Sequence, residues 1–143
     1  MSTTGKTWVA LGAALAGLGV VAGAFGAHGL EGRLSPQQLE TFEVAVRYQM
    51  YHALALVLVG ILAGRASRAV AGILFLAGIA LFSGCLYAWV FTGIKTFALI
   101  VPIGGAAFIL GWFALAWSVF ARGAAEDAAR ARDASSRHTA DPR

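Results

Sequence analysis

Charged residues are scarce in this 143-residue chain: they make up 13% of it, whereas hydrophobic residues make up 59%. Soluble domains carry about 25% charged residues. The scarcity is uneven, because Asp, Glu, Lys and Arg are absent from four long stretches: 7–27, 48–64, 69–94 and 96–121. A water-soluble helix needs a polar face, and these stretches have none. The composition therefore favours a membrane protein over a soluble domain.

Alternation of polar and apolar residues is also missing from these stretches, which excludes lipid-facing β-barrel strands. A helix needs about 20 apolar residues to cross about 30 Å of hydrocarbon. We therefore predict an all-α fold, an integral membrane four-helix bundle, with spans at about 7–27, 48–64, 69–92 and 96–120. A cleavable signal peptide after Lys6 is the rival interpretation of the first stretch, which is longer than a usual signal core.

Two segments outside the spans also have recognisable patterns. Ser35 and Pro36 form a helix start, and apolar residues recur at helical spacing over 36–47. This predicts a short amphipathic helix before the second span, which either lies at the membrane interface or continues into that span. From residue 122 the composition changes to Ala, Arg, Asp and Ser. We predict a transmembrane domain over 1–121 and a polar, largely disordered tail over 122–143.

The distribution of basic residues predicts the orientation. Four spans place both termini on one side, together with Lys6, Arg65, Arg68 and Arg122. The opposite side holds fewer basic residues: Arg33, Arg47 and Lys95. Because basic residues accumulate in cytoplasmic loops, we expect both termini to lie in the cytoplasm.

Several functional classes lack their usual signals. The single cysteine, Cys85, cannot form an internal disulfide, and there is no CxxC or HExxH motif. No carboxylate lies inside a span to mark a proton or ion path, so a transporter or channel is a weak interpretation. Nucleic-acid binding is usually indicated by a stripe of basic residues interleaved with aromatics, and this sequence has no such stripe. We therefore expect no cofactor, no nucleic-acid partner and no enzymatic activity.

The informative polar residues gather near one depth. They are His28, Glu43, Tyr48, Gln49, His52 and Tyr87. The simpler interpretation of His52 is a hydrogen bond between helices. The alternative is a ligand site in the outer leaflet, built around His28 and His52, for haem, a metal ion, a quinone or a lipid. Two imidazoles alone are a weak metal signal.

Glycines are the other recurrent feature of the spans, and small residues let helix backbones approach closely. The candidates for helix packing are Gly19, Gly23, Gly60, Gly64, Gly84, Gly104 and Gly105. They serve either packing within one bundle or association with another membrane protein. The main functional hypothesis is thus a non-enzymatic protein that self-associates or acts as an accessory subunit.

Four segments together carry a family resemblance: GAFGAHGL at 23–30, FEVAVRYQMYHALAL at 42–56, LFSGCLYAWVFTG at 81–93 and PIGGAAFILGWFALA at 102–116. They resemble the family called domain of unknown function 423, the YgdD-type bacterial membrane proteins related to animal transmembrane protein 256. The resemblance covers about residues 8–120, in the same order. It implies a small multi-helix protein of the bacterial inner membrane and brings no reaction, ligand or catalytic residue with it. Cys85 stands where the family pattern leads us to expect a small residue such as Ser.

Overall fold

The computed structural model describes residues 2–62 and 65–140, and these residues form helices and short connections without a strand. The helices are α1 (Thr3–Gly29), α2 (Pro36–Leu62), α3 (Arg65–Gly78), the π-helical segment η1 (Ile79–Gly84), α4 (Cys85–Thr92) and α5 (Thr96–Ala140). Since α3, η1 and α4 follow one another without a break, they form one rod. Among the described residues, four helices are long and apolar enough to cross a membrane. The predicted all-α class and the four helices are confirmed.

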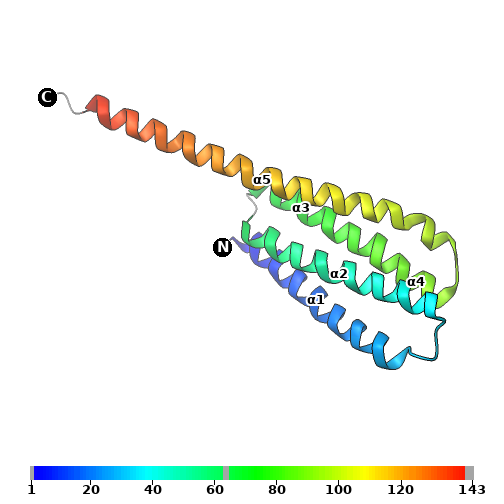
Figure 1. Ribbon diagram of the computed structural model, residues 1–143. Helices are drawn as coiled ribbons and strands as arrows, with labels where there is room; N and C mark the ends of the chain where they lie inside the picture. The colour runs from blue at the N-terminus through cyan, green and yellow to red at the C-terminus, as the bar shows by residue number, and fades with distance from the viewer. Residues whose placement is uncertain (1, 63–64, 141–143) are drawn as a thin grey trace.

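The four helical rods run antiparallel, each beside the next (Figure 1). α1 packs mainly on α2, α2 on the rod of α3, η1 and α4, and that rod on α5. We call the end with the 30–35 connection and the turn at 93–95 the loop end, and the opposite end the terminal end. Both chain termini lie toward the terminal end (Figure 1). α1 and α5 lie at the two ends of this row, so each keeps a broad face free of protein.

The amphipathic segment 36–47 is the beginning of α2 rather than a separate interfacial helix. The helix start was predicted at the right place: the backbone N–H of Gln38 donates to Ser35 Oγ (3.3 Å), and the Ser35 N–H donates back to Gln38 Oε1 (3.0 Å). The helix then continues because no breaker follows. Its apolar face is also occupied, since Phe42 packs against Gly26 of α1. Phe42 is thus buried in the protein, and Leu39 and Val46 pack partly against the same cluster.

The tail differs from the prediction of disorder, because α5 continues as helix to Ala140. Alanine is the strongest helix former, and this segment is rich in it. Arg122 Nε also donates to Glu126 Oε1 at 2.8 Å, one helical turn away. The extension points away from the other helices at the terminal end (Figure 1).

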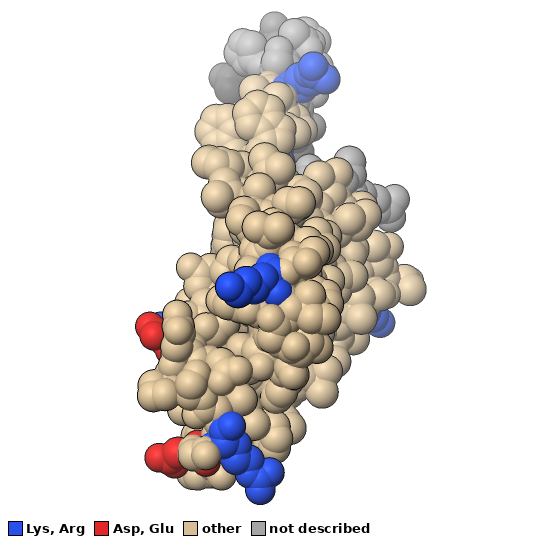
Figure 2. Space-filling view, turned by 90° about the vertical axis from the view of Figure 1, so that its right-hand side faces the viewer, with Lys and Arg blue, Asp and Glu red and all other residues tan. Residues whose placement is uncertain are grey.

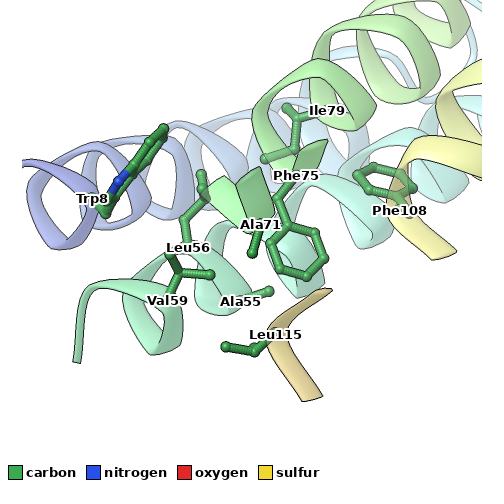
Figure 3. Packing of buried hydrophobic residues seen from close by; sticks show 9 residues of the cluster. All are labelled: Trp8, Ala55, Leu56, Val59, Ala71, Phe75, Ile79, Phe108 and Leu115. Atoms are coloured by element: carbon green, nitrogen blue, oxygen red, sulfur yellow. The ribbon is translucent and has the colours of Figure 1, made fainter. Parts of the chain in front are cut away.

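The main core lies between α2, the α3–η1–α4 rod and α5, with Trp8 of α1 at its edge (Figure 3). Leu56 and Phe75 are fully buried there. A smaller cluster of Leu30, Phe42 and Val90 lies toward the loop end. These two clusters fix the position of α2, which therefore carries the polar residues considered below into the middle of the protein.

Glycines bring the helices into backbone contact at three places. A Cβ at Gly12 would lie 2.6 Å from the Ala53 carbonyl oxygen, and one at Gly60 would lie 2.6 Å from the Gly5 carbonyl oxygen. A Cβ at Gly104 would lie 2.8 Å from the carbonyl carbon of Leu81, which is part of the π-helical segment. Hence α1 is tied to α2, and α5 to the rod, at positions that accept no side chain.

The other glycines proposed for packing are placed less tightly. Gly19 and Gly23 face α2 at ordinary contact distances, and Gly105 is 3.8 Å from the Phe82 ring. Gly84 is exposed and meets nothing closer than 3.8 Å. Gly64 lies outside the described residues. Conversely, Gly72, Gly78 and Gly111 press against the aromatic rings of Trp8, Phe108 and Phe75.

Candidate functional site

His52 is buried between α2 and α5, with 5% of its surface exposed. Its Nδ1 lies 2.8 Å from the Tyr48 carbonyl oxygen, and Trp112 Nε1 donates to its Nε2 at 3.3 Å. A carbonyl only accepts and an indole N–H only donates, so Nδ1 carries the proton and Nε2 its lone pair. The ring also stacks on Phe108 with centroids 3.4 Å apart. His52 is therefore a neutral, fully hydrogen-bonded imidazole that links two helices.

Gln49 forms a second polar cluster, on the side of α2 that faces α1 and α4. Its Nε2 donates to the Leu15 carbonyl oxygen at 2.9 Å, and Tyr87 Oη donates to its Oε1 at 3.1 Å. The side chain is buried, with 7% exposed. The Gln49 side-chain amide thus joins three helices. Inside a membrane no water is available to replace these hydrogen bonds if they are lost.

The structure does not bring His28 to these clusters. His28 is exposed in the last turn of α1, at the loop end. Gly26 packs against Phe42, which precedes His52 by ten residues on α2. His28 lies two residues beyond Gly26, so at 1.5 Å per residue the two histidines are roughly 18 Å apart along the helices. The expected outer-leaflet site that combines His28 with His52 is therefore not assembled.

Tyr48 borders the His52 cluster through its carbonyl oxygen, whereas Glu43 lies apart from both buried clusters. Tyr48 is 38% exposed, and its ring stacks on Phe82 at 4.5 Å. Glu43 is exposed on another face of α2. Together with Arg47 it lines a groove between α1 and α2. The six residues proposed as one site thus belong to two hydrogen-bond clusters and two exposed positions.

The donor set does not suit a metal ion. Within the described part of the chain, no three His, Cys, Asp or Glu side chains are close enough to share one. Cys85 is buried in the rod, and both nitrogens of His52 are already engaged. Binding of a metal to Nε2 would have to break the bond from Trp112.

Trp112 is the residue that the sequence analysis missed. It lies on α5, sixty positions after its partner His52. Inside an apolar span an indole is indistinguishable from any other large hydrophobic residue by pattern alone. The only available signal is chemical: a Trp in a span carries an N–H that needs an acceptor when buried.

Grooves between the described helices include two that are lined by the candidate residues. One, of about 480 Å³, lies between α2 and α5 and is lined by the rings of Tyr48, His52 and Phe108. The other, of about 530 Å³, lies between α1 and α2 toward the loop end. Viewed from the loop end, the charged residues form small separate patches on an otherwise uncharged surface (Figure 2).

These features define a multi-pass helical membrane protein whose polar residues connect its helices. The profile of the family described as "Protein of unknown function (DUF423)" matches residues 22–105. A UPF0382 membrane protein of Staphylococcus aureus (strain bovine RF122) is 49% identical over 117 residues, which cover 80% of this chain and 96% of the relative. The UPF0382 membrane protein YwdK of Bacillus subtilis is 48% identical over 111 residues, 75% of this chain and 90% of the relative.

The chain belongs to this family of bacterial membrane proteins, as its sequence motifs predicted. No solved structure matches it. The relatives' names state a membrane location and no activity. The family membership therefore agrees with the fold and leaves the function to be argued from the surface of the protein.

Proposed function

We propose that this protein is a non-enzymatic protein of the bacterial inner membrane that acts by associating with a second copy of itself through α1. The observation that carries the proposal is the exposure of α1. In α1 17% of the span is buried, compared with 22% for the span of α5 and 44% for α2 and for the span formed by the rod. An integral membrane helix this lightly packed is the natural place for a further contact.

The free face of α1 has the composition that helix association in membranes requires. Ala10, Ala13 and Gly17 are exposed and lie on one helix face, and a Cβ at Gly17 would meet nothing within 4 Å. Small residues at this spacing let two backbones approach closely. A two-fold axis through this face would bring the same residues together from both copies.

Crosslinking tests this association in the native membrane. In a Cys85→Ser background, Ala13→Cys and Gly17→Cys should give a disulfide-linked dimer on mild oxidation. Leu18→Cys, which is exposed on another face of α1, is the matched control and should stay monomeric. Gly17→Leu should reduce the dimer fraction while the helix content stays unchanged. Equal crosslinking at positions 13 and 18, or none at any position, would contradict the proposal.

The orientation belongs to the same proposal. The excess of basic residues near the terminal end supports cytoplasmic termini, with the 30–35 connection outside. In intact cells a membrane-impermeant maleimide should label Arg33→Cys and should not label Arg122→Cys until the membrane is permeabilised. The reverse labelling pattern would show that the chain is inserted the other way round.

A further inference from the structure

The groove between α1 and α2 carries two charges in otherwise apolar surroundings. Its volume is about 530 Å³ and it opens on the side of the protein. Its apolar part is formed by residues such as Gly19, Val20, Gly23, Val46 and Met50. Glu43 and Arg47 are its charged residues. Such a combination is unusual in a membrane span, where charges mark functional positions.

Arg47 lies well inside the depth that α1 spans. Gly19 of α1 faces Met50 and Gly23 faces Val46, so Arg47 is level with the residues between these two glycines. The uncharged run of α1 extends from residue 7 to residue 30. Arg47 is therefore eight or nine residues from the loop end of that run, which corresponds to roughly 12 Å. If about 30 Å of hydrocarbon is centred on this uncharged run, the Arg47 backbone lies about 10 Å below the hydrocarbon boundary at the loop end.

Among the described residues, the Arg47 guanidinium has no carboxylate partner. The ion pair that these residues do form joins Arg122 and Glu126 on α5. Helical side chains tilt toward the N-terminus of their helix, and the N-terminus of α2 is at the loop end. The side chain can therefore extend toward the lipid headgroups while its stem stays in the groove. At that level the abundant anion is a lipid phosphate.

Glu43 supplies the second half of the site. It precedes Arg47 by one helical turn and so lies about 6 Å nearer the loop end on the same groove. In an aminophospholipid the phosphate is joined to the acyl part and the ammonium extends beyond it. The deeper cation and the shallower anion thus match the order of charges in that headgroup.

We propose that this groove binds one phospholipid with an ammonium in its headgroup. The phosphate pairs with Arg47, the ammonium pairs with Glu43, and an acyl chain lies over Gly19 and Gly23. A second protein helix fits less well, because it would bury both charges unless it carried two complementary ones at the same spacing. The proposal does not depend on association through α1, whose face at Ala10, Ala13 and Gly17 lies nearer the terminal end.

Native mass spectrometry of the full-length protein in detergent tests the site. We expect added 1-palmitoyl-2-oleoyl phosphatidylethanolamine to be retained at one molecule per chain, and to outcompete phosphatidylglycerol with the same acyl chains. Arg47→Gln and Glu43→Gln should each weaken retention at least tenfold. Arg33→Gln and Glu40→Gln, which remove exposed charges outside the groove, are the matched controls and should leave retention unchanged.

The possible outcomes separate the alternatives. Preference for phosphatidylglycerol, or loss of binding with Arg47→Gln but not with Glu43→Gln, would overturn the pairing with an ammonium. Equal weakening by all four variants, or no retention of either lipid by the parent protein, would overturn the site itself. The competition between the two lipids uses only the parent protein, so it decides the point even if a variant fails to fold.

Discussion

Replacing Gly104 with alanine is expected to lower the free energy of unfolding by about 2–3 kcal/mol, whereas the same change at Gly105 should be neutral or raise it by up to about 1 kcal/mol. A Cβ at Gly104 would lie 2.8 Å from the Leu81 carbonyl carbon and 2.9 Å from Phe82 Cα. These are backbone atoms of η1 and cannot rotate away. A Cβ at Gly105 would lie 3.8 Å from the Phe82 ring, which is an ordinary contact.

The two neighbouring positions make a sharp comparison, because the substitution, the helix and the local sequence are the same. Unfolding of the purified protein in mixed micelles, followed by circular dichroism as a function of denaturing detergent, gives both values. The same measurement on Gly12→Ala and Gly17→Ala repeats the contrast in α1, where Gly12 meets Ala53 and Gly17 is open. Equal stability of the Gly104 and Gly105 variants would mean that α5 does not pack on η1 as described.

Removing the His52 ring is expected to be the other strongly destabilising change. His52→Ala should cost about 3 kcal/mol, because it removes a buried ring stacked on Phe108 and leaves the Trp112 N–H without its acceptor. His52→Phe keeps the ring and loses the hydrogen bonds, so it should cost about 1 kcal/mol. The matched control is the exposed His28→Ala, which should change stability by less than about 0.5 kcal/mol.

The same variants distinguish a structural histidine from a ligand. Thermal unfolding gives the stability, while an absorption spectrum and elemental analysis of protein purified from its native membrane report haem and metal. If His52 only links helices, stability falls and both measurements match those of the parent protein. A Soret band or a stoichiometric metal that disappears in His52→Ala would contradict the structural interpretation and restore the ligand site.

The fold was predictable because its causes are local in the sequence. Uncharged stretches of sufficient length dictate membrane spans, and the Ser35–Pro36 start places the beginning of α2 correctly. The motif YQMYH was informative about the family, and two of its residues, Gln49 and His52, are indeed buried polar groups. The tail was harder to predict, since a composition rich in Ala, Arg and Asp suits both a helix and a disordered segment.

The site was only partly predictable because its partners come from distant positions. Tyr48, Gln49 and His52 are close in sequence, yet Gln49 faces α1 and α4 while His52 faces α5. The prediction grouped these polar residues into one site because they lie at the same depth in the membrane. Residues at one depth can nevertheless lie on different sides of a helix. The glycine faces showed the same difficulty, because spacing alone did not distinguish Gly104, which touches backbone, from Gly84, which is exposed.

The four membrane spans and the family membership follow from the order and hydropathy of the residues alone. Which polar groups meet depends instead on how the helices pack. Their packing pairs His52 with Trp112 and Gln49 with Tyr87, and it leaves Arg47 without a carboxylate partner in a groove beside Glu43. The difference arises because hydropathy is a property of each residue alone, whereas a hydrogen bond or ion pair depends on how the helices are rotated against one another.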